Sequence, residues 1–329
     1  MTKPIQGIHD DRFQAFIVTV YQRMDKSAVL WYSANMKQRQ IRTKIRKAVI
    51  PVAGFGTRFL PMTIAQPKEM LPIVDKPIIQ IVVEQVVAAG VEEIIFVTGR
   101  NKRAIEDHFD YSGELERLLR EGNKLEQLKE VHRISQLAKF VFVRQNKMLG
   151  NGHAILMAKE VVGNEPFFMC WGDDFFESRV PVAKQLIDAF HERQSTIIGA
   201  YPVAPERVQK YGIIKPKGKV TTTTFAMAGI VEKPKPSQAP SMFGMFGGAV
   251  LTPDIFRYLE KAKPTVGGEI VYVDGINALA KRQPVFAHQL QGRYWDTGDK
   301  AEYMKANIHF ALQHKDLKDS IASFLHNTK

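Results

Sequence analysis

The sequence predicts an α/β fold: a Rossmann-like, mixed and mostly parallel sheet flanked by helices. Residues 48–52 and 93–98 are short apolar runs of the kind that forms buried strands. Between them, five apolar residues recur on one face of a helix that ends at Gly90, namely Ile79, Val82, Val83, Val86 and Val87. A strand, a helix and a second strand in this order form a parallel pair with a right-handed crossover.

The remaining elements follow from the same patterns. The first helix is expected to begin with Asp75 near its cap and Pro77 in its first turn. Further strands are predicted at residues 139–143, 166–175, 196–203, 244–251 and 285–290, with a hairpin connection at 215–224. Further helices are predicted at residues 104–136, 153–162, 182–193, 253–261 and 299–313. This alternation supports the α/β prediction.

Composition places the chain among ordinary globular proteins. Its 329 residues, 45% hydrophobic and 24% charged, suffice for one large α/β domain or two smaller ones. No apolar stretch approaches the roughly 18 residues that cross a bilayer, so no membrane association is expected. Cys170 is the only cysteine, so an internal disulfide is excluded and a reducing, cytoplasmic location is expected.

The net charge of +12 is unevenly distributed. Residues 1–47 hold ten Lys or Arg against three acids, which leaves only +5 for the rest of the chain. Residues 1–46 are therefore predicted to be a basic, poorly ordered extension. Residues 47–315 are predicted to form the main folded domain, and 316–329 a C-terminal tail. The modest excess suits an enzyme that binds polyanionic phosphates better than a nucleic-acid-binding protein.

A glycine-containing loop follows the first predicted strand. Gly54 and Gly56 free the backbone to approach a bulky anion, and Thr57, Arg58 and Lys68 add a hydroxyl and two cations. These features indicate a nucleoside triphosphate site. The loop is not a dinucleotide-binding loop, which needs a third glycine where this chain has Phe59. It is not a P-loop either, because the spacing of its glycines differs and no Lys-Ser or Lys-Thr follows.

The run from Gly54 to Arg58, followed by Pro-Lys-Glu-Met-Leu-Pro at 67–72, resembles the signature of sugar-1-phosphate nucleotidylyltransferases. The Lys-Glu-Met-Leu-Pro form is most similar to that of the bacterial UTP–glucose-1-phosphate uridylyltransferases. The resemblance spans residues 47–312 and at least five motifs. It implies the nucleotide-diphospho-sugar transferase type of fold, with a smaller β-rich sugar-binding portion, and a homodimer or homotetramer. It also assigns nucleotide contacts to Ala53, Gly54, Gly56 and Thr57.

Two further motifs carry the nucleotide and metal assignments. The first is similar to the family's base-binding segment and consists of Gln145, four residues and then Gly150-x-Gly152-His-Ala. This resemblance implies that Gln145, Gly150 and Gly152 lie at the uracil. Residues 166–175 end in two acids, and carboxylates at the carboxyl end of a strand are suited to hold Mg²⁺ near phosphates. The resemblance makes Asp173 one ligand, and the late Asp-x-Gly segment makes Asp296 the second.

The sugar side is assigned by three segments. Tyr-Gly at 211–212 implies that Gly212 approaches the sugar, and Val-Glu-Lys-Pro at 231–234 implies that Glu232 bonds sugar hydroxyls while Lys233 holds the sugar phosphate. Gly-Gly-Glu-Ile at 267–270 adds Glu269 to the sugar site. Alternation along a strand points Glu232 and Lys233 to opposite faces, but Pro234 breaks the strand, so both are expected to reach one pocket.

The implied reaction is Mg²⁺-assisted, in-line transfer of a uridylyl group from UTP to glucose-1-phosphate. It releases pyrophosphate, with Arg58, Lys68 and Lys233 as the catalytic cations. Trp-Asp-Thr-Gly at 295–298 is also similar to thymidylyltransferases, so dTTP or another hexose-1-phosphate stays open as a substrate. A non-catalytic sugar-nucleotide sensor is the alternative from another class, although it has no need of both metal carboxylates. The sequence leaves open the sugar, the number of subunits and any effector.

Overall fold

The computed structural model of the chain describes residues 44–327. The extension predicted at residues 1–46 therefore lies almost wholly outside the described residues. Within residues 44–327, no helix is both long and apolar enough to cross a membrane.

One nine-stranded sheet organises the described chain. From one edge to the other, its strands are β5 (Lys139–Arg144), β4 (Glu93–Thr98), β1 (Lys47–Pro51), β6 (Phe167–Met169), β11 (Phe243–Leu251), β8 (Ile197–Pro202), β12 (Phe286–Gln289), β10 (Thr224–Glu232) and β9 (Gly212–Pro216). The α/β class is confirmed, and the sheet is mixed as predicted. Its parallel part is smaller than expected, because β11 pairs antiparallel with β6 and β8, and β10 with β12 and β9.

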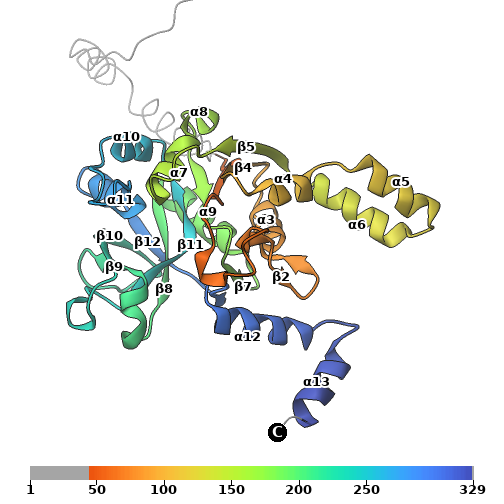
Figure 1. Ribbon diagram of the computed structural model, residues 1–329. Coiled ribbons are helices and arrows are strands. Elements are labelled where there is room, and N and C mark those ends of the chain that lie inside the picture. Colours follow the sequence, from red (N-terminus) through yellow and green to blue (C-terminus); the bar gives the residue numbers. More distant parts are fainter. Residues whose placement is uncertain (1–43, 328–329) are drawn as a thin grey trace, which may run out of the picture. The chain divides into compact units, whose positions relative to one another are not determined.

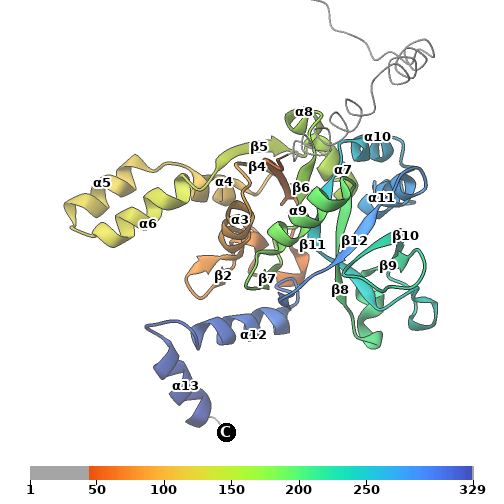
Figure 2. The ribbon, with the colours of Figure 1, turned by 180° about the vertical axis from the view of Figure 1, so that it is seen from behind.

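The central strand β1 is buried on both faces. Ala48 and Ile50 pack into one hydrophobic core and Val49 into the other, because neighbouring residues of a strand point to opposite sides. Helices α3 (Ile78–Ala88) and α9 (Val182–Arg193) cover the first face, and α7 (Asn151–Met157), α10 (Asp254–Glu260) and α11 (Tyr272–Ala280) cover the second. Figures 1 and 2 show these helices on either side of the sheet.

Strand pairing makes several element boundaries differ from the prediction. Asp75 does not cap a helix: Lys76–Pro77 forms strand β3, which pairs with β2 (Pro72–Ile73), and α3 starts after Pro77. The strand predicted at 166–175 is two strands, β6 and β7 (Phe175–Glu177), and β7 pairs with β13 (Arg293–Trp295). The expected β-rich portion continues the main sheet through β10 and β9.

The helical elements around the sheet follow the predicted segments. Residues 104–136 fold as α4 (Arg103–Phe109), α5 (Gly113–Glu121) and α6 (Leu125–Ser135), and the α5–α6 pair projects away from the sheet (Figures 1 and 2). The predicted helix at 153–162 is α7 followed by the short α8 (Lys159–Val162). Helix α12 (Lys300–Ala311) is capped by Asp299, and α13 (Lys318–Asn327) lies in the predicted tail.

Candidate active site

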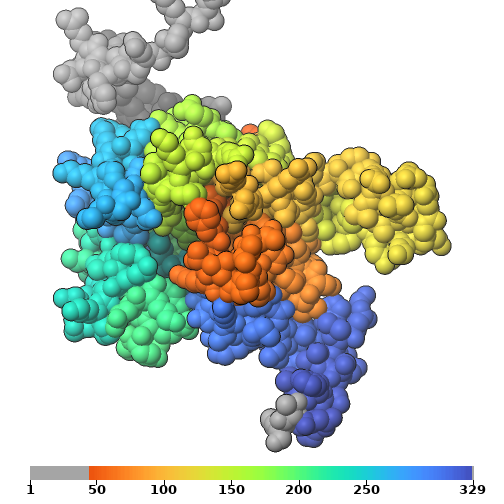
Figure 3. Space-filling model, in the orientation of Figure 1, coloured from red at the N-terminus to blue at the C-terminus, as the bar shows by residue number. Residues whose placement is uncertain are grey.

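A cleft of about 780 Å³ opens beyond the carboxyl ends of β1 and β6. Polar groups gather at this edge of an open α/β sheet because the loops after the strands converge there. Twelve of the residues predicted for the site line the cleft: Ala53, Gly54, Gly56, Thr57, Arg58, Lys68, Gln145, Gly150, Asp173, Glu232, Lys233 and Glu269. The space-filling view shows the hollow beside the orange surface of the first loop (Figure 3).

The loop after β1 presents its backbone to the cleft. Gly56 has a left-handed φ of 67°, and a Cβ there would lie 3.2 Å from the Cβ of Lys68, so this turn favours glycine. The Thr63 hydroxyl donates to the Gly56 carbonyl at 2.8 Å and holds the turn. At Gly54, by contrast, an added Cβ would meet nothing within 4 Å, so the space beside this backbone is open for a ligand.

Two ion pairs lie at the floor of the cleft. Lys68 pairs with Asp173, and the neighbouring Glu69 accepts a hydrogen bond from Lys102 at 2.7 Å. Burial alone lowers the pKa of Lys68, but the carboxylates of Asp173 and Glu69 outweigh it and raise that pKa. Burial raises the pKa of Glu69 and lowers that of Lys102, although each partner opposes the shift.

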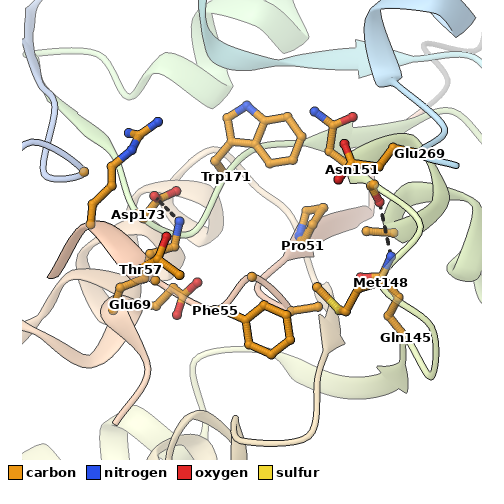
Figure 4. Close-up of a pocket in the computed structure, with 18 of the residues that line it drawn as sticks. Pro51, Phe55, Thr57, Glu69, Gln145, Met148, Asn151, Trp171, Asp173 and Glu269 are labelled. Atoms are coloured by element: carbon orange, nitrogen blue, oxygen red, sulfur yellow. Dashed lines mark hydrogen bonds and ion pairs between the residues drawn. The ribbon is translucent and has the colours of Figure 1, made fainter. Parts of the chain in front are cut away.

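Gln145 is buried with its amide held in place. Its Nε2 donates to the Gly150 carbonyl at 3.1 Å and lies 3.0 Å from Nδ1 of His153. Burial lowers the pKa of His153, which favours the neutral ring that can accept this bond. With both amide hydrogens engaged, the carbonyl oxygen is the group that Gln145 offers to a ligand. Figure 4 shows Gln145 beside Met148 at one end of the cleft.

Gly150 and Gly152 have a structural reason to be glycine. A Cβ at Gly150 would lie 2.6 Å from the Ile270 carbonyl oxygen, and one at Gly152 would lie 2.9 Å from the same atom. Gly150 also has a left-handed φ of 92°. Both residues therefore allow the start of α7 to pack against residues 269–272. Gly152 is buried beneath this contact and is not among the residues that line the cleft.

Glu232 and Lys233 reach one pocket although they are sequence neighbours. Strand β10 ends at Glu232, and Lys233 adopts a left-handed φ of 47°, which turns its side chain back toward the cleft. Their charged groups lie 3.7 Å apart, and each side chain is about half exposed. Gly212 lies behind them and does not line the cleft. A Cβ added to Gly212 would lie 3.0 Å from Oε2 of Glu232.

The two predicted metal carboxylates converge from different loops. Both approach Gly298, which lines the cleft. A Cβ added to Gly298 would lie 3.3 Å from Oδ1 of Asp296, 3.4 Å from Nη1 of Arg58 and 3.6 Å from Oδ2 of Asp173. The hydroxyl of Thr297 donates to the Asp173 carbonyl and ties the two loops together. Asp174 points elsewhere, where it accepts a hydrogen bond from Tyr294 at 3.0 Å.

This pair of carboxylates is suited to hold a divalent metal ion whose other ligands come from elsewhere. In residues 44–327 no three His, Cys, Asp or Glu side chains gather closely enough to form a self-sufficient metal site. Magnesium is commonly held by one or two carboxylates, with phosphate oxygens and waters supplying the other ligands. Asp173 and Asp296 beside an open cleft match that pattern, although Asp173 pairs with Lys68 in this structure.

Several lining residues were not predicted from the sequence. Phe55, Met148, Asn151 and Trp171 form walls of the cleft, and Figure 4 shows Trp171 between Asp173 and Asn151. Phe55, Met148 and Asn151 occupy variable positions within the recognised motifs, and Trp171 directly precedes the Gly-Asp-Asp run, so the motifs assign none of them a contact. Glu69 lies inside the recognised Lys-Glu-Met-Leu-Pro motif, yet its partner Lys102 is 33 residues away, so their pairing has no local signal.

Comparison with known proteins places the chain among sugar-nucleotide enzymes. The nucleotidyl transferase family model matches residues 47–312. A UTP–glucose-1-phosphate uridylyltransferase of Bacillus subtilis is 46% identical over 285 residues, which cover 86% of this chain and 96% of the relative. The enzyme of the same name from Streptococcus pneumoniae is 46% identical over 287 residues, 86% of this chain and 96% of its own.

Solved structures agree with this similarity. The UTP-bound UGPase of Acinetobacter baumannii superposes with a TM-score of 0.81 at 36% identity, covering 87% of this chain and all of that one. A UDP-glucose pyrophosphorylase complexed with UDP-glucose gives a TM-score of 0.75 at 40% identity, covering 82% of this chain and all of that one. By sequence and by fold, the chain belongs to the nucleotidyl transferase family.

Proposed function

We propose that this protein transfers the uridylyl group of UTP to glucose-1-phosphate, giving UDP-glucose and pyrophosphate. The observation that carries the proposal is the cleft that joins the glycine loop, Lys68, Asp173, Gln145 and the Glu232–Lys233 pair. The relatives named for this reaction support it, as do those solved with UTP and with UDP-glucose. The protein is an enzyme in this proposal, rather than a sugar-nucleotide sensor.

The cleft divides into three parts in this proposal. The carbonyl oxygen of Gln145 accepts from the N3–H of uracil, and Gly150 lies at the base. The backbone at Ala53, Gly54, Gly56 and Thr57, with Arg58 and Lys68, receives the triphosphate. Lys233 binds the phosphate of the sugar, while Glu232 and Glu269 bond its hydroxyls. Gly152 and Gly212 support this arrangement from behind the walls.

The chemistry requires no covalent intermediate. An oxygen of the sugar phosphate attacks the α-phosphorus of UTP, the bond to the β-phosphate breaks, and the electron pair leaves with pyrophosphate. Arg58 and Lys68 neutralise the departing charge, and Lys233 holds the attacking phosphate against charge repulsion. Asp173 and Asp296 would hold Mg²⁺, which supplies neutralisation of the phosphate oxygens when it is bound.

The first test is pyrophosphate release with Mg²⁺ and glucose-1-phosphate, using UTP, dTTP, ATP, CTP and GTP in turn. Strong preference for UTP is expected. Preference for dTTP would contradict the uridylyl assignment, and no release with any nucleotide or hexose-1-phosphate would favour the sensor.

Asp173→Asn is expected to lower turnover by about 100-fold, the scale of losing one electrostatic group at the reacting phosphates. Asp107→Asn is the matched control, because Asp107 is an exposed helix residue paired with Arg103 outside the cleft. A decrease below about threefold in Asp173→Asn would remove Asp173 from the mechanism.

A further inference from the structure

Tyr211 contacts Asp296 without lining the cleft. Its hydroxyl donates to Oδ2 of Asp296 at 3.0 Å, and Nη2 of Arg207 donates to the same hydroxyl at 2.9 Å. A guanidinium has no acceptor atom, so the tyrosine oxygen must accept from Arg207. The single hydroxyl hydrogen is then directed at Asp296. The direction of the bond is therefore fixed by chemistry, even though hydroxyl hydrogens rotate freely elsewhere.

This bond determines which carboxylate oxygen of Asp296 is available. Tyr211 donates to Oδ2. The other oxygen, Oδ1, lies beside Gly298: a Cβ added to Gly298 would be 3.3 Å from Oδ1 of Asp296 and 3.6 Å from Oδ2 of Asp173. Arg207 lies 3.9 Å from Oδ2 as well. The carboxylate is thus held by Oδ2, and Oδ1 lies beside Gly298, where Nη1 of Arg58 and Oδ2 of Asp173 also approach the same point, to 3.4 and 3.6 Å.

The Tyr211 ring is itself held firmly. It packs against Phe246, with ring centroids 4.7 Å apart, and the guanidinium carbon of Arg207 lies 5.8 Å from the centroid of the Tyr211 ring. Its backbone carbonyl accepts a hydrogen bond from the backbone N–H of Lys233 at 3.0 Å. One residue therefore connects the loop of Asp296 with the turn that presents Lys233.

We propose that Tyr211, supported by Arg207, is a positioning residue that orients Asp296 for a divalent metal ion. The inference rests on the proposed function, because it takes Asp296 as a metal ligand. Tyr211 acts through Asp296 and not on the substrate. A tyrosine hydroxyl, with an ordinary pKa of about 10, keeps its hydrogen at neutral pH. Partners of this kind typically change metal affinity by about 10- to 100-fold.

The test is Tyr211→Phe, which removes only the hydroxyl. Mn²⁺ binding is measured by electron paramagnetic resonance in the presence of UDP-glucose, so that no turnover is needed. The variant is expected to bind Mn²⁺ about 10- to 100-fold more weakly. Its kcat is expected to return toward that of the wild type when the metal concentration is raised, which a general structural defect would not produce.

Tyr201→Phe is the matched control. Tyr201 packs against the same Phe246, but its hydroxyl donates to the Gly292 carbonyl at 3.0 Å and touches no carboxylate. Its Mn²⁺ affinity is expected to match the wild type. Equal Mn²⁺ binding by wild type and Tyr211→Phe would overturn this proposal alone. Absence of Mn²⁺ binding by the wild type would overturn it together with the metal assignment.

Discussion

Lys68 occupies the carboxylate that the proposed metal needs. In this structure its ammonium pairs with Asp173, and the pKa of Lys68 is raised by that carboxylate and by Glu69 despite burial. A metal ion that binds Oδ2 of Asp173 therefore competes with the lysine, which is free to contact phosphate once it is displaced. The metal and the triphosphate are expected to increase each other's affinity, because the Lys68 ammonium that the metal displaces from Asp173 can pair with the phosphates.

Lys68→Met should separate these two roles. We expect turnover to fall about 100-fold, since a phosphate-facing cation is lost. We also expect Mn²⁺ binding without nucleotide to become about tenfold tighter, the scale on which one adjacent charge shifts an ionic equilibrium. Mn²⁺ titration of the free protein measures this. Lys76→Met is the control, because Lys76 pairs with Glu84 away from the cleft. Weaker metal binding in Lys68→Met would contradict the competition.

At the scale of elements, two glycine turns of similar sequence serve different purposes. Gly54→Ala places a methyl group in open space at an ordinary φ, so the free energy of unfolding should hardly change while the KM for UTP rises. Gly150→Ala places a Cβ 2.6 Å from the Ile270 carbonyl oxygen and puts alanine at a left-handed φ of 92°. It should lower the free energy of unfolding by about 1–3 kcal/mol.

Urea unfolding and UTP kinetics on both variants check this contrast. Gly163→Ala is the control for strain alone, because Gly163 has a left-handed φ of 68° but open space around it. It should be less destabilised than Gly150→Ala. If Gly54→Ala bound UTP as the wild type does, the open space beside Gly54 would not be where the nucleotide lies.

Local patterns explain which elements were predictable. The strand at 93–98 and the helix at 182–193 were confirmed residue by residue, because apolar periodicity alone specifies them. Strand β7 and the end of β6 were not predictable, because β7 exists only through its pairing with β13, more than a hundred residues later. Asp75 failed as a cap for a local reason, since it lies in the turn between β2 and β3, and their pairing delays the helix to Ile78.

At the scale of the whole molecule, the sheet gathers distant motifs. Family motifs identified twelve lining residues between Ala53 and Glu269, because each motif is a loop that follows a strand or precedes a helix at one edge of the sheet. The walls formed by Phe55, Met148 and Trp171 were not predictable, since an apolar side chain at a cleft looks like one in a core. Buried pairs such as Glu69 with Lys102 depend on the complete fold.

The Glu69–Lys102 pair joins the cleft floor to the start of α4. Both side chains are at most 5% exposed, and their charged atoms lie 2.7 Å apart. Lys102→Met leaves the Glu69 carboxyl buried without its partner. Removing one member of a buried pair typically lowers stability by about 3–5 kcal/mol, because the remaining charge is uncompensated. Glu69→Gln combined with Lys102→Met removes both charges and should recover part of this loss.

The pH dependence of Lys102→Met gives the sharper test. Burial already raises the folded-state pKa of Glu69 above 4.5, and loss of Lys102 removes the cation that most strongly opposes this effect of burial. The folded variant then holds a proton that the unfolded chain has released. Its free energy of unfolding should therefore fall, relative to the wild type, as the pH rises from about 4.5 through the raised pKa. Urea unfolding followed by circular dichroism between acidic and neutral pH measures this difference. A pH-independent deficit would mean that Lys102 acts through packing of its aliphatic chain and not through its charge.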